Sequence, residues 1–143
     1  MPGSVGTDGT PGPDLAAAVA LVGRLQRALG QGDRARIVGC LGELVDLRAP
    51  MGPQWQQLAH IAADQGELGL SRGAMALYVE ASGNDPRARY QQAGLLAQGG
   101  ALRKAYAILQ TLPETVPDPA ANAYSRGAAA LFLGETDEAR ERL

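Results

Sequence analysis

Hydrophobic residues recur three or four positions apart along most of the chain, which is the spacing of amphipathic helices. The first stripe of this kind comprises Leu15, Val19, Val22, Leu25 and Leu29. Asp14 comes directly before it and has a side chain suited to an N-cap. The pattern therefore predicts a first helix over 14–30, with this stripe as its apolar face.

Four glycines, Gly32, Gly66, Gly100 and Gly134, follow one another at a constant interval of thirty-four residues. Positions at fixed distances from each glycine are apolar or small. These columns are Ala28, Ala62, Leu96 and Ala130 four residues before the glycine, Ile37, Ser71, Ala105 and Ala139 five after it, and Leu41, Met75, Leu109 and Leu143 nine after it. A constant period of this length is typical of helical repeats.

Each of these glycines predicts a tight helix-turn-helix, because glycine adopts the left-handed conformation that closes a helix at little steric cost. An acid follows three of them, Asp33, Glu67 and Glu135, where it would lie at the positive end of the next helix dipole. Prolines interrupt the pattern after each pair. The predicted helices are 14–30, 34–48, 53–65, 69–82, 87–98, 101–112, 119–133 and 136–143.

The composition favours helices over strands. The chain has 26 Ala and 19 Leu, against ten Val and Ile together and six aromatic residues. Residues 1–13 are rich in Gly and Pro, so we expect a flexible leader there and one helical domain over 14–143. The predicted fold class is all-α.

The repeat unit resembles that of the tetratricopeptide repeat (TPR) family. The matching residues are Trp55, Leu58, Ala59, Gly66, Tyr78, Ala81 and Pro86 in the second unit, Tyr90, Gly94, Gly100, Ala105 and Pro117 in the third, and Tyr124, Ala128, Gly134 and Ala139 in the fourth. The first unit departs at Leu21 and Ile37, and the second fits better with Ala74 than with Ser71 if its turn is three residues longer. The resemblance implies a right-handed solenoid of about four TPR-like helix pairs, the last incomplete.

In a TPR-like array the first helix of each pair lines a concave groove that binds a protein or peptide. Carried over to this chain, the resemblance places Gln26, Gln56, His60, Asp64, Gln91, Leu95, Gln98 and Ser125 in the groove, with Val22, Leu29, Ala63 and Ala129 beside them. This lining is neutral and lacks the Lys and Asn set by which some family members hold a C-terminal carboxylate. The resemblance therefore implies a non-catalytic scaffold that binds an apolar or amphipathic helix.

The alternative is that the chain forms the N-terminal repeat portion of a larger enzyme, such as a bacterial sulfotransferase-type transferase. Leu143 falls in an inward-facing column with nothing beyond it, so we expect either that the natural protein continues or that its open C-terminal end is covered by self-association.

Few residues suggest chemistry. His60 and Asp64 are one helical turn apart, but the chain has no second histidine to complete a metal site or a catalytic triad. Cys40 lies within the apolar pattern of its helix, which predicts a buried small hydrophobe. Catalytic residues, metals and cofactors are accordingly expected to be absent.

The charge and hydropathy of the chain argue against nucleic acid and membrane as partners. The net charge is −2 with both signs interspersed, unlike the basic patch of a nucleic-acid-binding protein. The longest apolar run, 15–23, is about half the length needed to cross a bilayer. A single cysteine indicates a reducing compartment, so we expect a cytoplasmic protein, and the excess of Arg over Lys is typical of a high-GC bacterial genome.

Overall fold

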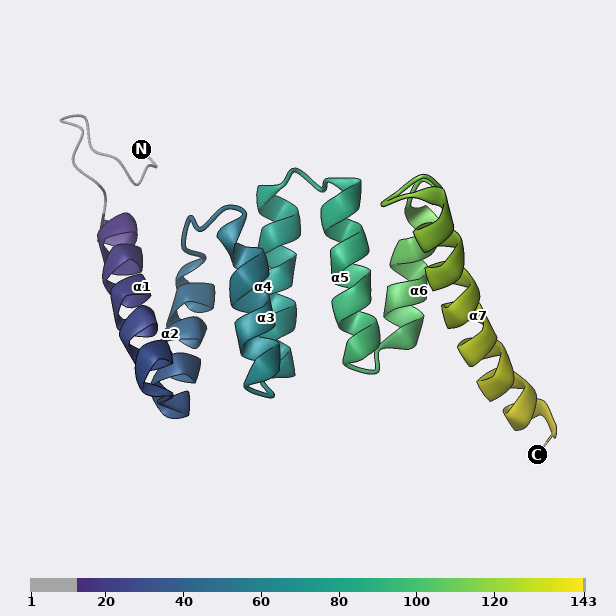
Figure 1. Cartoon of the computed structure of the whole chain (residues 1–143), viewed down its shortest axis with the longest axis horizontal. Helices are drawn as coiled ribbons and strands as arrows, with labels where there is room; N and C mark the ends of the chain where they lie inside the picture. The colour runs from purple at the N-terminus through teal and green to yellow at the C-terminus, as the bar shows by residue number, and fades with distance from the viewer. Residues whose placement is uncertain (1–12, 143) are drawn as a thin grey trace. The chain divides into compact units, whose positions relative to one another are not determined.

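The computed structural model describes the backbone of residues 13–142 and the side chains of residues 15–134 (Figure 1). The described residues form helices and contain no strand, which confirms the predicted all-α class. The helices are α1 (Pro13–Gln31), α2 (Arg34–Leu47), α3 (Gln54–Asp64), α4 (Leu68–Ala81), α5 (Pro86–Gln98), α6 (Leu102–Thr111) and α7 (Pro119–Arg142). The predicted leader lies outside the described residues, except for Pro13, at which α1 begins.

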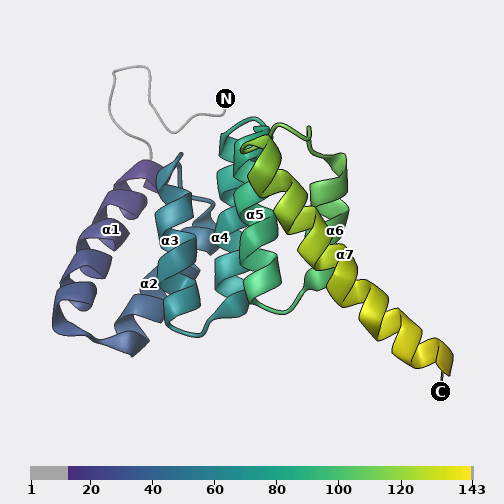
Figure 2. The ribbon, with the colours of Figure 1, turned by 45° about the vertical axis from the view of Figure 1, so that its right-hand side comes forward.

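The chain divides into two compact units, Met1–Tyr78 and Val79–Leu143, and the division falls within α4. In the first unit α1 and α2 pack side by side and run in opposite directions (Figure 1). In the second unit α6 packs against both α5 and α7 (Figure 2).

Three of the four predicted glycine turns are present and share one hydrogen-bonding pattern. Gly66 has a φ of 78°, its N–H donates to Ala63 O at 2.9 Å, and the N–H of Glu67 donates to Ala62 O at 2.9 Å. This pair of bonds is a Schellman motif, which satisfies carbonyls that the end of a helix leaves without partners. Gly32 and Gly100 also have positive φ and make the same two bonds.

The following helices begin at Arg34, Leu68 and Leu102, again thirty-four residues apart. The turn at Gly66 is therefore no longer than the others, and the alternative that placed Ala74 in the contact column is wrong. Ser71 occupies that column and is 1% exposed. Its hydroxyl donates a hydrogen bond of 2.8 Å to Ala59 O, which joins α4 to α3 and satisfies the buried polar group.

The fourth predicted turn is wrong. Helix α7 passes through Gly134 and ends at Arg142, so 119–133 and 136–142 are parts of one helix that extends past α6 (Figures 1 and 2). Glycine permits a left-handed conformation without requiring it. The sequence from 135 to 142 has one apolar residue, Ala139, and so offers little apolar surface to fold back against α7. Leu143 lies outside the described residues.

The buried face of α1 also differs from the predicted stripe. Val19 is 64% exposed and Leu29 is 39% exposed, and of the stripe only Leu25 is buried. The residues of α1 that face the core are Ala18, Leu21, Leu25 and Ala28. The alanine side chains at two of these positions occupy little volume, which allows α2 to pack closely against this face of α1.

Alanine substitutions at two of the recurring glycines should change the free energy of unfolding in opposite directions. Gly66→Ala should destabilise the protein by about 1 kcal/mol, because a residue with a Cβ is strained at positive φ. Gly134→Ala should stabilise it by up to about 1 kcal/mol, because Gly134 lies within a helix and its added Cβ would contact no heavy atom within 4 Å.

The free energies of unfolding can be measured by urea titration followed by far-UV circular dichroism. If both variants were destabilised by a similar amount, Gly134 would occupy a turn like that at Gly66, and the continuous helix through Gly134 would be contradicted.

Candidate binding groove

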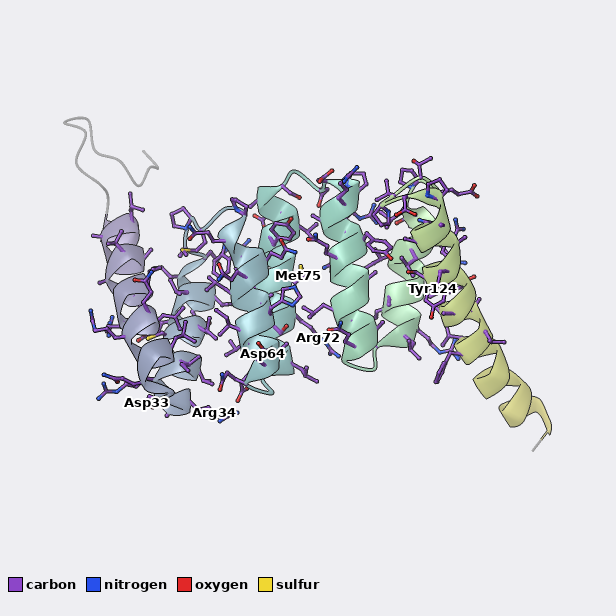
Figure 3. The ribbon with its side chains drawn as sticks, in the orientation of Figure 1. Asp33, Arg34, Asp64, Arg72, Met75 and Tyr124 are labelled. Carbon is purple, nitrogen blue, oxygen red and sulfur yellow. The ribbon has the colours of Figure 1, made fainter. Side chains whose placement is uncertain are left out.

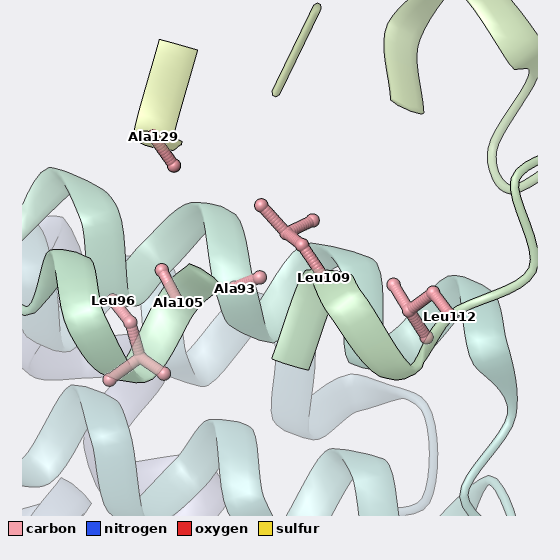
Figure 4. Packing of buried hydrophobic residues seen from close by; sticks show 6 residues of the cluster. All are labelled: Ala93, Leu96, Ala105, Leu109, Leu112 and Ala129. Carbon is pink, nitrogen blue, oxygen red and sulfur yellow. The ribbon is translucent and has the colours of Figure 1, made fainter. Parts of the chain in front are cut away.

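The second unit has a core built from α5, α6 and α7. The buried cluster comprises Ala93, Leu96, Ala105, Leu109, Leu112 and Ala129 (Figure 4). Alanine is present on all three helices in this cluster, so the side chains between them are short. Close approach of the backbones follows from this choice of residues.

An apolar pocket of about 250 Å³ lies over this core. Its lining residues are Tyr90, Ala93, Gly94 and Ala97 of α5, Leu102, Ala105 and Leu109 of α6, and Tyr124, Ser125, Ala128, Ala129 and Phe132 of α7. The polar side-chain groups in this lining are the hydroxyls of Tyr90, Tyr124 and Ser125. The lining contains no carboxylate, amine or imidazole.

The hydroxyls of Tyr90 and Ser125 share a hydrogen bond of 2.7 Å, which joins α5 to α7. Both residues are half-buried, so this bond satisfies polar groups that water reaches only in part. The two hydroxyls are thus engaged with each other, and the rest of the pocket between them and Phe132 presents carbon atoms to a ligand.

Beside the pocket, α7 exposes large hydrophobic side chains. Tyr124 is 78% exposed, Leu131 65% and Phe132 62%, and the position of Tyr124 on α7 is marked in Figure 3. Together with Ala128 these residues are spaced i, i+4, i+7 and i+8, which is the spacing of one apolar helix face. We call the pocket together with Tyr124, Ala128, Leu131 and Phe132 the α5–α7 groove.

Four of the predicted groove residues are in the second unit. Ser125 lines the pocket, and the neighbouring Ala129 does so too. Gln91 and Gln98 are exposed on α5 and do not line it, and Leu95 is 8% exposed and also outside the lining. The structure therefore brings Ser125 to the groove and places the other three on α5 outside the pocket lining, with Leu95 buried.

The other four predicted residues are in the first unit. Gln56 and His60 line one shallow surface depression on α3, whereas Gln26 and Asp64 do not contribute to it. His60 and Asp64 are exposed, and the imidazole makes no hydrogen bond or ion pair with any residue that the structure describes. Within this unit Cys40 is 7% exposed, which confirms the prediction of a buried cysteine.

The sequence contained a signal for the groove residues that were not predicted. Tyr90 and Tyr124 are thirty-four residues apart, and so are Gly94 and Ala128. These are the same positions that carry the resemblance to the TPR family. The predicted positions 91, 95 and 98 are each one residue beyond the lining residues Tyr90, Gly94 and Ala97 of α5, a rotation of about 100° around the helix.

Comparison with known proteins gives no further guidance: no protein-family model matches the chain, and neither does any curated protein or solved structure. Within the part of the chain that the structure describes, no three His, Cys, Asp or Glu side chains are grouped to hold a metal ion. No helix among residues 13–142 is both long and apolar enough to cross a membrane.

The Tyr90–Ser125 bond is open to a double-mutant test. Tyr90→Phe and Ser125→Ala should each lower the free energy of unfolding by about 1 kcal/mol, because each removes one partner of a half-buried hydrogen bond. The double variant should lose about as much as either single variant, since the bond can be removed only once. Chemical denaturation of the four proteins measures this coupling, and fully additive losses would show that the hydroxyls act independently.

Proposed function

We propose that the chain is a TPR-like repeat array that acts as a protein-protein interaction scaffold and holds an amphipathic helix of a partner in the α5–α7 groove. The observation that carries the proposal is the apolar pocket, which continues into the exposed side chains of Tyr124, Leu131 and Phe132. Exposed hydrophobic patches of this kind characterise protein interaction sites.

The shape of the groove supports a helix as the occupant. Beyond Tyr90 the lining residues of α5 are the small residues Ala93, Gly94 and Ala97, which leave one wall of the depression low. A ridge of apolar side chains on a partner helix can enter a groove of this form, anchored at i, i+3 or i+4, and i+7. An extended peptide would instead need backbone hydrogen-bonding groups, and the lining consists of helices whose backbone groups are bonded internally.

The chemistry of the lining supports binding over catalysis. Its side chains offer two phenols and one hydroxyl, and the hydroxyl of Ser125 is bonded to Tyr90. A serine nucleophile needs a base within hydrogen-bonding reach. The lining of this pocket offers no carboxylate, amine or imidazole that could serve as that base. The alternative of a repeat portion within a larger enzyme makes a different prediction, a reading frame that continues into a catalytic domain.

A matched pair of glycine variants tests the groove. Gly94 lines the pocket and Gly127 of α7 does not, yet an added Cβ would contact no heavy atom within 4 Å at either position. Gly94→Arg should therefore place a long charged side chain in the groove without disturbing the helix, and Gly127→Arg provides the same charge and length elsewhere. The probes are helical peptides selected against the whole chain from a displayed random library.

We expect the selected peptides to be amphipathic and to bind the Gly127→Arg variant as tightly as the unchanged protein. Gly94→Arg should weaken binding at least about tenfold, and Phe132→Ala should weaken it as well, since truncation of a central aromatic anchor commonly costs about 2 kcal/mol or more. Fluorescence anisotropy gives the dissociation constants. Equal affinities for the two arginine variants would show that the peptides bind another face.

A further inference from the structure

A second pocket, of about 620 Å³, lies between α1 and α2 in the first unit and differs in chemistry from the groove. Its walls are Arg24, Arg27, Ala28 and Gln31 of α1 and Arg36, Gly39, Cys40 and Glu43 of α2. Each wall is one helix face, because both sets are spaced i, i+3, i+4 and i+7. The volume is in the range of sites that hold small molecules.

Positive charge dominates this pocket, with three arginines and one carboxylate in the lining. Arg36 is partly neutralised, since its Nε lies 3.3 Å from Asp33 Oδ2. Arg24 and Arg27 make no hydrogen bond or ion pair with any residue that the structure describes. Two guanidinium groups with no partner among the residues 15–134 whose side chains are described therefore line the α1 side of one pocket.

The opposite wall leaves room beside these arginines. A Cβ at Gly39 would contact no heavy atom within 4 Å, so the space next to α2 is not filled by protein. Ala28 and the largely buried Cys40 add a small apolar surface. Glu43 is seven residues from Arg36, about 10 Å along α2. Glu43 and Asp46 line a neighbouring depression together with Arg24, so acidic side chains lie toward the Arg24 end of the pocket.

We propose that the pocket between α1 and α2 binds a small organic anion that carries a doubly charged oxyanion group, either a phosphate monoester or a pair of neighbouring carboxylates. Guanidinium groups bind both through charge-assisted, often bidentate hydrogen bonds. The apolar part of the ligand would contact Ala28 and Cys40. This site is separate from the α5–α7 groove, and it does not depend on the function proposed for that groove.

Phenyl phosphate and phthalate serve as the two anionic probes, and benzamide as a neutral probe with the same ring. Binding to the whole chain is followed by calorimetry and by the amide resonances of Gly39 and Cys40. We expect saturable binding of at least one anion at millimolar concentrations or below, weakening with added salt, and no binding of benzamide. The preferred anion then distinguishes phosphate from paired carboxylates as the recognised group.

Variants of the pocket, together with matched controls, locate the site. Arg27→Gln should weaken anion binding about tenfold, because it removes a charge-assisted hydrogen bond to the anion. Gly39→Leu should weaken binding by occupying part of the space beside α2, and Glu43→Gln should strengthen it severalfold by removing the carboxylate of the lining. Gly30→Leu is the matched control, since Gly30 also has open space around it and does not line the pocket.

Three results would overturn the proposal. The first is that neither anion binds the unchanged protein at millimolar concentrations. The second is equal weakening by Gly39→Leu and by Gly30→Leu. The third is equal weakening by Arg27→Gln and by Arg72→Gln, since Arg72 of α4 is exposed and does not line this pocket.

Discussion

The backbone turn at the recurring glycines is the constraint on which the rest of the structure depends. At each of the three turns the residue after the glycine donates its N–H to the carbonyl five positions back, and a new helix begins at Arg34, Leu68 or Leu102. The turn fixes where the second helix starts, and so the column five residues after the glycine is buried each time. In the first unit Arg34 also binds Gln65 O at 2.8 Å and Glu67 Oε1 at 3.0 Å, which ties one turn to the next.

Small side chains at the helix contacts determine what lies between the helices. Ser71 donates a hydrogen bond to the backbone carbonyl of Ala59, and both are small residues, which lets α3 and α4 approach closely. In the second unit Ala93, Ala105 and Ala129 form much of the buried cluster. The same use of small residues continues to the surface at Gly94, Ala97 and Ala128, where no larger side chain fills the space, and this is why the core opens into an apolar groove.

The helices were predictable from the sequence because their boundaries rest on local backbone chemistry. Gly66 closes α3 as predicted. The same thirty-four-residue period predicted a turn at Gly134, where the helix instead continues, since glycine can also continue a helix when the following residues offer no apolar face that would pack back against it. The orientation of each helix was less predictable. Val19 and Leu25 belong to one sequence stripe, yet only Leu25 is buried, because the position of α2 decides which side of α1 is covered. The same limit applies to α5, where one residue, a rotation of about 100° around the helix, separates the predicted position Gln91 from Tyr90 of the pocket lining.

Each of the two candidate sites has a glycine within a helix as part of its lining. Gly39 and Gly94 each weaken their helix by about 0.5–1 kcal/mol relative to alanine, and neither is required by packing, because an added Cβ would contact no heavy atom within 4 Å. Gly30 and Gly127 leave similar open space, so the absence of a side chain does not by itself create a site. What distinguishes Gly39 and Gly94 is a neighbouring helix that supplies the other wall. That wall carries Arg24 and Arg27 beside Gly39, and Tyr124 and Phe132 beside Gly94. The two spaces therefore arise in a similar way, but one is lined by cationic side chains and the other by aromatic ones.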